Sequence, residues 1–521
     1  MTEREKKLLD QVEKLVKSNA ALTKENTLLR EKVDLLIRKL FGSKSEKIDP
    51  AQLELLLEGL APKKPQAADA QEDAPAADDL NLPPSKKPAR KERKPRLPEH
   101  LPVEDTILDP EEVKANPGAW RQIGQEITEQ LDYHPGRFTR KRLIRRKYVP
   151  RHALDGAPLI AKLPQSLQEA CLATPALIAE IIANKYGQHL PFYRQEQSFK
   201  QRFGVEISRQ NMINWEALAC DWLKPLYHLT RRSLLGTDTL QADETPIRYL
   251  EPGTGKSHQG YLWAYRDART GTQFFDWKTT RASTSLSGIL QADEEAKRTG
   301  LSDFQGILQS DGYSGYQAYA KTHPGIELAA CWAHARRKFD EAKTASPRIT
   351  GWILRQIGLL YQIEARLRET RAGPALREAI RQSQSVPIYN RIGKALEKLK
   401  PRYLPQSLLG KAIQYTLGLW PRLGIYLGNG RVEIDNNLTE NAIRPTAIGK
   451  KNWLFFGSAD SGWKAALIFT LAGNCKRLGI DFHAYLKDVL ERLPAMTNHQ
   501  VHQLLPENWL KEKQAATRLA S

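Results

Sequence analysis

Three acidic residues have the types and local settings that a divalent metal site requires. They are Asp243 in QADETP, Asp311 in ILQSDGYSGY and Glu440 in DNNLTENAIRP. Asp243 and Asp311 each follow a short apolar run, which predicts a strand end at each acid. Glu440 follows two residues that could cap a helix, Asn436 and Asn437, so we expect it in the first helical turn. Two strand ends and one helix can converge on a metal site, which would support phosphodiester chemistry.

The charges of these side chains suggest a mechanism. At neutral pH the carboxylates are ionised by default, so Asp243 could bridge two Mg²⁺ ions while Asp311 and Glu440 hold one each. Two ions about 4 Å apart would activate the attacking oxygen and stabilise the leaving one, and Mn²⁺ could replace Mg²⁺. Such a reaction needs no nucleotide cofactor, and the sequence has no glycine-rich phosphate loop before a helix.

Several basic residues stand close to these acids in the sequence. Arg444 lies four residues after Glu440, one helical turn along the same face. CWAHARRKF holds Cys331 and His334 at a spacing typical of zinc sites, but no second ligand pair stands nearby, so we expect no zinc. The cations that we expect to hold a phosphate backbone are Arg336, Arg337, Lys338, Arg444, Lys450 and Lys451.

Length and composition favour a large enzyme with a polyanionic partner. The chain has 521 residues, a net charge of +19 and a pI near 9.6, and Lys and Arg gain binding free energy by releasing counterions from phosphate. Its four scattered cysteines exclude a disulfide framework and fit a reducing compartment. The start, MTEREKKLL, has no apolar signal region and no run reaches membrane-spanning length, so we expect no membrane partner and a location inside the cell.

A heptad pattern predicts a coiled coil over residues 1–45. Leu recurs every seven positions, and a second position four residues later carries Val, Asn or Leu. Asn19 and Asn26 favour a parallel dimer in fixed register, because paired amides satisfy each other. We therefore expect a homodimer or higher oligomer, with an amphipathic helix packed on its own chain as the alternative. The seam positions are Leu8, Leu15, Leu22, Leu29 and Leu36 with Val12, Asn19, Asn26, Val33 and Leu40.

Two basic segments follow the heptads. Residues 46–98 are rich in Ala, Pro, Asp and Lys and end in KKPARKERKPR. This composition cannot bury enough apolar surface to offset the entropy of ordering, so we expect a disordered basic linker. Its basic end could touch a DNA backbone, and a solvated run of charge is the alternative.

The sequence of residues 99–160 predicts a small basic domain that presents a strand or hairpin for DNA contact. Its cations are Arg137, Arg140, Lys141, Arg142, Arg145, Arg146 and Lys147.

Residues 161–232 change to helical periodicity. PALIAEIIANKYG, PFYRQEQSFKQRFG and ISRQNMINWEALACDWLKPLYHL predict three helices, with Gly204 ending the second and Ser208 capping the third. This is the spacing of a helix-turn-helix motif, although three-helix packing without DNA binding explains the pattern equally well. The side chains that the third helix would present to base edges or phosphates are Arg209, Gln210 and Asn214.

The remaining chain supplies the elements that would position the three acids. After QADETP, GYLWAYRD and TQFFDWKT predict a hairpin, residues 284–298 a helix ended by Gly300, and FQGILQSD a buried strand. Three strands, a helix and a strand carrying Asp311 is the order of a ribonuclease-H-like fold, within a mixed α/β class. We expect the first part of the catalytic core at 233–334, a helical insertion at 335–431, the second part with the Glu helix at 432–480 and a helical tail at 481–521.

Five stretches, in this order, closely resemble the DDE transposases of insertion-sequence family sixty-six. They are ADETP, LQSDGYSGY, ELAACWAHARRKF, EIDNNLTENAIRP and GKKNWLFFGS, and the similarity extends from LFGSKSEK near residue 40 to LLPENW near 505. The resemblance implies that Asp243, Asp311 and Glu440 are the DDE triad. It also implies a ribonuclease-H-like core with a helical insertion, preceded by a coiled coil and a helical DNA-binding region.

The activity implied by the resemblance is transposition of a bacterial insertion sequence. Such a protein would bind double-stranded DNA at terminal inverted repeats, cut it to free a 3′-OH, and join that hydroxyl to target DNA. Small accessory proteins of the same element would be further partners, and the location would be the bacterial cytoplasm, at the nucleoid. His334 would support the site or contact the scissile phosphate, with a buried structural histidine as the alternative.

The chain departs from the family pattern in two places. The residue after the first acid is often a second Asp, whereas here it is Glu244, which we expect on the opposite face of the strand from Asp243. Many relatives carry a zinc ribbon within 99–160, but EEVKANPGAWRQIGQEITEQL and RKYVPRHAL contain no cysteine. Without thiolates a tetrahedral structural zinc cannot form, so we expect none there.

Two other functions fit parts of the sequence. A ribonuclease-H-like nuclease or junction resolvase would share the metal chemistry but stop at hydrolysis. A non-catalytic coiled-coil DNA-binding regulator would share the first 232 residues without needing acids at strand ends. Strand transfer separates the first from a transposase, and metal-dependent cutting separates the second.

Overall fold

The computed structural model describes residues 171–520 apart from 252, and shorter pieces before them. Those pieces are 164–169, the pairs 147–148 and 159–160, residues 136–141, and scattered helical positions between 14 and 29. Residues 136–141 belong to a separate unit that spans 48–142. The expected linker at 46–98 and most of the small basic domain therefore lie outside the described residues.

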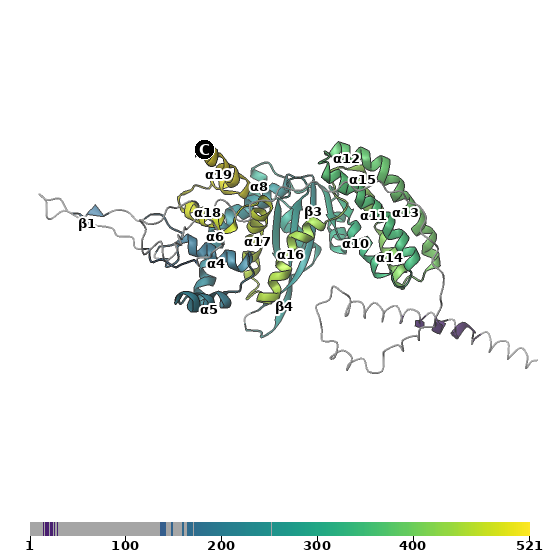
Figure 1. Cartoon of the computed structure of the whole chain (residues 1–521), viewed down its shortest axis with the longest axis horizontal. Coiled ribbons are helices and arrows are strands. Elements are labelled where there is room, and N and C mark those ends of the chain that lie inside the picture. The colour runs from purple at the N-terminus through teal and green to yellow at the C-terminus, as the bar shows by residue number, and fades with distance from the viewer. Residues whose placement is uncertain are drawn as a thin grey trace, which may run out of the picture. The chain divides into compact units, whose positions relative to one another are not determined.

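Three helices precede the sheet, as the periodicity of 161–232 predicts (Figure 1). The Thr174 hydroxyl accepts from the Leu177 amide at 3.4 Å to cap the first, and Gly204 ends the second in the left-handed conformation at φ 65°. Ser208 caps the third through the Asn211 amide at 3.2 Å. The three helices are α4 (Pro175–Tyr186), α5 (Phe192–Phe203) and α6 (Arg209–Leu235).

A five-stranded mixed sheet follows, in the order β5-β4-β3-β6-β7. The hairpin is confirmed, since β3 pairs antiparallel with β4 and β4 with β5, whereas β3, β6 and β7 run parallel. The stretch IELAA, for which no strand is predicted, forms β7. The strands are β3 (Thr239–Leu250), β4 (Ser257–Asp267), β5 (Gln273–Lys278), β6 (Gly306–Ser310) and β7 (Ile326–Ala330), with α9 (Ser314–Thr322) between the last two. A separate two-residue ladder pairs β1 (Lys147–Tyr148) with β2 (Leu159–Ile160).

The single helix predicted over 284–298 is wrong. Three short pieces replace it, η2 (Ser283–Leu286), α7 (Ser287–Leu290) and α8 (Glu294–Arg298). The reason is tertiary, because the Arg231 side chain of α6 donates to the carbonyl oxygens of Gly288 and Gln291 and to the Asp293 carboxylate. These bonds satisfy carbonyl groups that a continuous helix would use internally.

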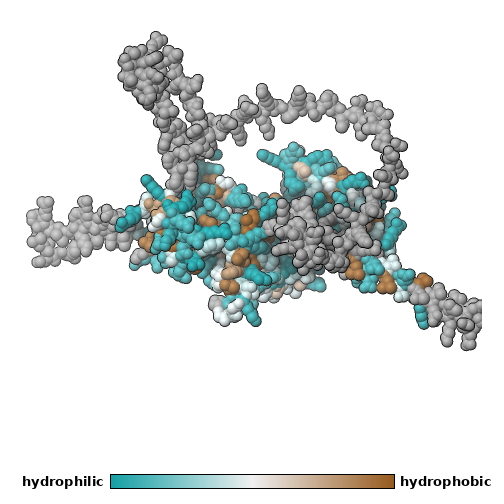
Figure 2. Space-filling model, turned by 60° about the horizontal axis from the view of Figure 1, so that its bottom comes forward, coloured by the Kyte–Doolittle hydropathy of each residue, from teal (hydrophilic) through white to brown (hydrophobic). Residues whose placement is uncertain are grey.

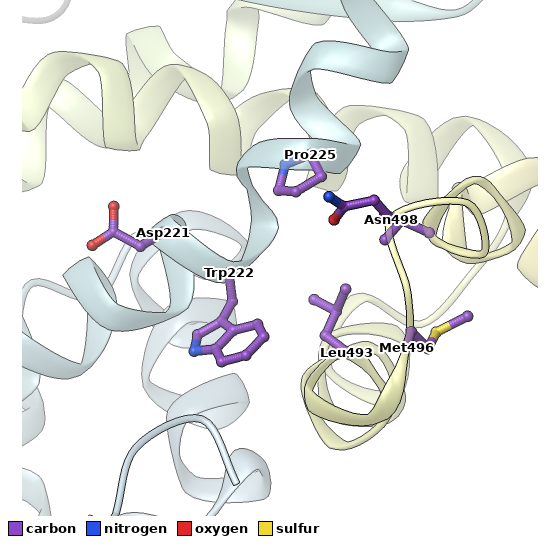
Figure 3. A pocket seen from close by; sticks show the side chains of 7 residues that line it. Asp221, Trp222, Pro225, Leu493, Met496 and Asn498 are labelled. Atoms are coloured by element: carbon purple, nitrogen blue, oxygen red, sulfur yellow. The ribbon is translucent and has the colours of Figure 1, made fainter. Parts of the chain in front are cut away.

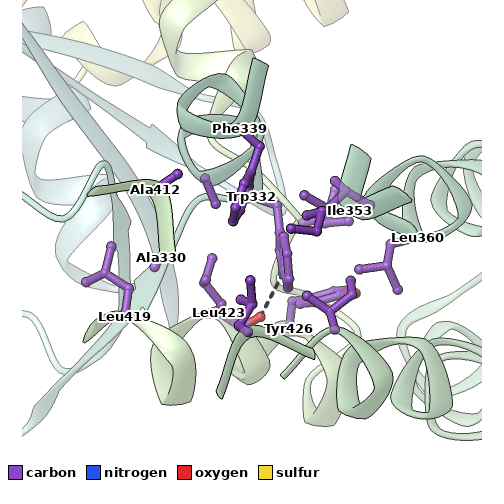
Figure 4. Close-up of a cluster of buried hydrophobic side chains, with 14 of the residues drawn as sticks. Ala330, Trp332, Phe339, Ile353, Leu360, Ala412, Leu419, Leu423 and Tyr426 are labelled. Atoms are coloured by element: carbon purple, nitrogen blue, oxygen red, sulfur yellow. Dashed lines mark hydrogen bonds between the residues drawn. The ribbon is translucent and has the colours of Figure 1, made fainter. Parts of the chain in front are cut away.

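The chain between β7 and α16, where a helical insertion is predicted, is mainly helical and packs around a hydrophobic core centred on Trp332 (Figure 4). The Trp332 ring is fully buried, and its Nε1 donates to the Leu423 carbonyl at 3.0 Å. The insertion packs on the sheet where α15 meets β7. Its helices are α10 (Trp332–Glu341), α11 (Pro347–Glu369), α12 (Pro374–Ile380), the π-helical η3 (Arg381–Ser385), α13 (Val386–Leu399), η4 (Lys400–Arg402), α14 (Leu408–Gly418) and α15 (Trp420–Gly428).

The chain then returns to the sheet. Helix α16 (Asn437–Trp453) packs along β3 and β4, and α17 (Ser461–Leu478) packs on β5 and α6 (Figure 1). The last elements are α18 (Phe482–Arg492), η5 (Leu493–Ala495), η6 (Val501–Leu504) and α19 (Pro506–Ala520). Within the described part of the chain, no helix combines the length and apolar character needed to cross a bilayer.

Candidate active site

The register of the parallel strands places Asp243 opposite Asp311. Gln241 of β3 pairs with Gln309 of β6. The same register, carried two positions further along both segments, brings Asp243 and Asp311 to matching positions. Neighbouring strands lie about 5 Å apart, so the two acids share one point on the sheet.

Asp243 is not at a strand end, and that expectation is corrected. Strand β3 continues to Leu250, because β4 pairs with it from Leu240 to the last residue. The neighbour on the other side, β6, stops at Ser310, and Asp311 follows it directly, as predicted. Asp243 thus lies where β3 loses one of its two neighbours, which leaves room for other groups beside the carboxylate.

Two buried glutamines hold the segment that leads to Glu440. Gln241 Nε2 donates to Gln309 Oε1 at 2.8 Å and to the Asp435 carbonyl at 2.9 Å. Gln309 Nε2 donates to the Glu433 carbonyl at 2.7 Å. Neither glutamine is predicted as a functional residue. Each stands two positions before an acid in the similar strings LQAD and LQSD, which is the sequence signal that could have identified them.

Glu440 lies in the first turn of α16, as predicted, but the helix is capped differently. Asn436 occupies the N-cap position without a side-chain cap bond, and its Nδ2 donates to the Ala242 carbonyl at 3.5 Å. The Asp435 carboxylate instead accepts from the Asn437 amide at 3.2 Å. Because Asn436 is fully buried, its amide serves the contact with β3.

The three acids are close enough to affect one another. Burial, followed by repulsion from the carboxylates of Glu244, Glu440 and Asp311, raises the pKa of Asp243 to about 8. Glu440 Oε1 is buried and has no hydrogen-bond partner. The three carboxylates thus repel one another, and one carboxylate oxygen lacks a hydrogen-bond donor. A hard divalent cation would offset both, so the residues fit Mg²⁺ or Mn²⁺.

Two basic side chains, those of His334 and Arg337, lie near Glu440. His334 Nε2 is 3.6 Å from Oε1, and an Arg337 amino group is 3.7 Å from Oε2. Burial is the main cause that lowers the pKa of His334, and its Nδ1 is buried without a hydrogen-bond partner. His334 therefore lies beside Glu440, while Arg337 is mostly exposed and can turn toward a phosphate.

A potential third ligand stands beside the Cys-x-x-His pair. One ligand atom each from Cys331, His334 and Glu440 lies within 4.8 Å of the others. The fold brings Glu440 of α16 to this pair from more than a hundred residues away, which adds one ligand and not a second pair. Burial raises the pKa of the Cys331 thiol to about 12, which opposes its use as a thiolate. The absence of zinc stays a prediction.

Glu244 is held on the other face of β3, as strand alternation predicts. Its carboxylate accepts from Tyr316 Oη at 2.7 Å and from Arg281 Nε at 2.7 Å, and its side chain is 2% exposed. The Arg281 guanidinium in turn stacks on the Tyr313 ring, 3.8 Å from its centre. Glu244 thus belongs to a packed network behind the acidic site.

The basic residues predicted near the acids occupy two settings. Lys450 donates to Thr245 Oγ1 and to the Pro246 carbonyl, both at 3.3 Å, and so ties α16 to β3. The others are on the surface of α10 and α16. These exposed residues are Arg336, Arg337, Lys338, Arg444 and Lys451.

The predicted helix-turn-helix residues are exposed at the start of α6. Arg209 Nε lies 3.0 Å from Glu196 Oε2, and Gln210 Nε2 donates to Asn214 Oδ1 at 2.9 Å. These weak surface pairs leave the side chains accessible to a ligand. Of the basic segment, Arg137, Arg140 and Lys141 are exposed and Lys147 belongs to β1, whereas Arg142, Arg145 and Arg146 lie outside the described residues.

A hollow of about 240 Å³ lies away from the acids, between α6 and the C-terminal segment (Figure 3). Trp222 and Pro225 line the α6 side, and Leu493 and Met496 the opposite side. None of the residues that line it belongs to the carboxylate site.

Comparison with known proteins identifies the family of this chain. Residues 170–464 match the model of the Transposase IS66 family, and 470–506 match the IS66 C-terminal element. Residues 28–106 match a model described as Transposase C of IS166 homeodomain.

Similar proteins occur in Sinorhizobium fredii (strain NBRC 101917 / NGR234). The uncharacterized protein y4jD is 34% identical over 504 residues, which cover 92% of this chain and 94% of that protein. The uncharacterized protein y4hP is 29% identical over 528 residues, covering 95% and 90% respectively. The matched family model spans more than half of the chain and includes the segments that carry all three acids. The chain belongs to the IS66 family of transposases.

Proposed function

We propose that this transposase binds the terminal inverted repeats of its element, cuts the DNA there and joins the freed 3′-OH to target DNA, with Asp243, Asp311 and Glu440 as its DDE triad. The main observation behind the proposal is that the fold brings these three acids close together. Strand register sets Asp243 against Asp311, and the bonds of the two buried glutamines bring in the segment before Glu440.

The sheet supports assignment to the ribonuclease-H-like class. Three antiparallel strands are followed by two parallel ones, and the central strand β3 carries the first acid. The second acid follows the parallel neighbour of that strand, and the third comes from a helix packed on it. Two of the acids thus lie on regular elements and the third directly follows one, which gives the rigid support that a catalytic site needs.

The three carboxylates would hold Mg²⁺, or Mn²⁺ in its place. When bound, the metal activates the attacking oxygen and stabilises the leaving oxygen of the phosphodiester. The protein's own groups do the positioning. His334 and Arg337 lie against Glu440 and orient its carboxylate, and Arg337 with Arg444 is exposed to receive backbone phosphates.

DNA recognition is assigned to α5 and α6. Ser208 caps α6, and the exposed Arg209, Gln210 and Asn214 near its start can reach base edges or phosphates. The net charge of +19 adds sequence-independent attraction to DNA and a strong dependence on salt. This supports end binding by a bacterial nucleoid-associated enzyme.

Assembly is assigned to the N-terminal heptads. Leu22 and Leu29, both seam positions, are about half exposed in the single chain, at 55% and 50%. A second copy of this chain would bury them in a parallel coiled coil. We therefore propose a homodimer or higher oligomer, with small accessory proteins of the element as further partners.

The test is amide substitution of each acid. Asp243→Asn, Asp311→Asn and Glu440→Gln should each abolish metal-dependent cleavage and strand transfer on DNA that carries the element's ends, because each removes a charged ligand while preserving shape. End binding should persist, since it depends on Arg and Lys elsewhere. Glu244→Gln is the matched control and should retain activity, with its melting temperature measured because Glu244 is buried.

Different outcomes would redirect the assignment. Cleavage without strand transfer by the unaltered protein would make it a nuclease of the resolvase type. Loss of activity in Glu244→Gln with activity kept in Asp243→Asn would show that the first acid is misassigned.

A further inference from the structure

A strained turn follows the helix that carries Glu440. Leu454 has φ 65° and ψ −49°, and the Phe455 amide donates to the Trp453 carbonyl at 2.8 Å, which closes the rare strained form of the γ-turn. Among the described residues only three non-glycine residues have positive φ, and Leu454 is one. Backbone strain of this kind persists where the surrounding structure enforces it, and it concentrates at functional sites.

The turn presents two large apolar side chains to solvent. Leu454 is 64% exposed and Phe455 is 41% exposed. Within the described residues they are the only large exposed apolar side chains that are adjacent in the sequence. The face of the protein shown in Figure 2 is mostly hydrophilic, with apolar residues in small separate patches. An adjacent pair held outward by a strained turn is therefore unusual on this surface.

The turn is fixed on a rigid base. The Phe456 amide donates to the Arg248 carbonyl, and the Phe456 carbonyl accepts from the Leu250 amide, both at 2.9 Å, which attaches the turn to the end of β3. The buried Phe456 ring stacks on Trp453 at 5.0 Å and meets Trp277 edge-on at 5.1 Å. Leu454 and Phe455 thus project from a packed aromatic cluster and cannot fold back into it.

The turn also has a defined position relative to the acids. Fourteen positions separate Glu440 from Leu454, which is about 21 Å along a helix. Seven positions separate Asp243 from Leu250, which is about 23 Å along a strand. Because α16 packs along β3, the two estimates describe the same distance, from the acids to the turn at Leu454. This distance is about 20 Å, which corresponds to about six base pairs of duplex DNA at 3.4 Å each.

We propose that Leu454 and Phe455 form a wedge that inserts between base pairs of duplex DNA held at the active site, about six base pairs from the scissile phosphate. The inference rests on the proposed function. Apolar side chains that enter a base step unstack it and kink the duplex, which lets the protein contact more DNA.

The surroundings of the turn favour DNA over a protein partner. Lys450 and Lys451 lie in the last turn of α16, and the exposed Arg248 lies on the strand that holds Phe456. Positive charge around an apolar tip matches a phosphate backbone around stacked bases. The same two elements carry Asp243 and Glu440, two of the three acids that would act on that DNA.

The test scans the DNA with the fluorescent base analogue 2-aminopurine. Duplexes containing the terminal repeat and flanking sequence would carry the analogue at successive positions, with full-length protein and no divalent metal, so that no cleavage occurs. We expect fluorescence to rise several-fold at a step about five to seven base pairs from the cleavage site. Leu454→Gly, which accepts the positive φ, and Phe455→Ala should lose this signal. Leu376→Ala, an exposed leucine on α12, is the matched control and should keep it.

A second measurement separates the wedge from a structural role. An abasic site at the responsive step removes stacking in advance, so it should restore the DNA affinity that Phe455→Ala loses. The wedge is refuted if the unaltered protein binds and cleaves end DNA without unstacking any base in this window. It is also refuted if the variants change the oligomer mass but not the fluorescence, because the tip would then contact protein. Absence of both end binding and cleavage in the unaltered protein would instead refute the proposed function.

Discussion

Proton and metal should compete for Asp243. Burial and the neighbouring carboxylates raise the pKa of Asp243 to about 8, well above the ordinary value for Asp of about 4. At pH 7 only about one tenth of the metal-free protein would carry this side chain ionised. A divalent metal must displace the proton, so the apparent Mg²⁺ affinity should rise about tenfold per pH unit up to about pH 8 and then level off.

The raised pKa of Asp243 also makes the stability of the folded chain depend on pH. Between pH of about 4 and about 8 the folded chain holds a proton on Asp243 that the unfolded chain has released. The free energy of unfolding of the metal-free protein therefore falls as the pH rises through this window. Asp243→Asn removes the group, so the variant should be more stable than the unaltered protein above pH 8 without metal, and Mg²⁺ should stabilise it far less.

The assay is thermal unfolding from pH 6 to 9, in chelator and in Mg²⁺, with calorimetric titration of Mg²⁺ at each pH. Burial is also the main cause that raises the pKa values of Glu244 and Asp435. The difference between the variant and the unaltered protein therefore isolates Asp243. Asp221→Asn, an exposed acid on α6, is the control and should behave like the unaltered protein. A Mg²⁺ affinity that does not change between pH 6 and 8 would refute the reasoning.

Three further predictions concern assembly, the insertion and zinc. Deleting residues 1–40 should lower the mass measured by light scattering while the melting transition of the core persists, and an unchanged mass would show that the heptads pack within one chain. Glu364→Gln should lower the unfolding free energy in denaturant titration by about 3–5 kcal/mol, because it breaks the fully buried pair with Arg381, whose Nε donates to Glu364 at 2.7 Å. Elemental analysis should find no stoichiometric zinc, and the fold should survive chelator; one zinc per chain that disappears in Cys331→Ser would contradict this.

Much of the local structure could be predicted from the sequence. Gly204 and Ser208 end and begin helices in the structure as their types predict, because each cap acts through backbone groups within four residues. The hairpin of β4 and β5 follows from two apolar runs joined by a short turn. Glu440 falls in the first turn of α16, as predicted, although Asn436 makes no side-chain cap bond there.

The exceptions have tertiary causes. The stretch 283–298 has helical periodicity, but Arg231, more than fifty residues earlier, bonds its carbonyl groups and divides it into short pieces. Asn436 has the residue type of a cap, but burial against β3 commits its amide to Ala242. In both cases a partner distant in sequence overrides the local preference.

The candidate site also depends partly on local sequence and partly on tertiary contacts. The types of Asp243, Asp311 and Glu440 and their local settings are readable in the sequence, and so is the resemblance that singles them out. Their meeting depends on the register between β3 and β6 and on bonds from Gln241 and Gln309 to a segment more than a hundred residues later. Register and docking are decided by which buried groups can satisfy each other across the folded chain, and spacing along the sequence does not encode those pairings. Local hydrogen bonds and periodicity thus determined most of the elements, whereas long-range burial decided the acidic site and the strained turn at Leu454.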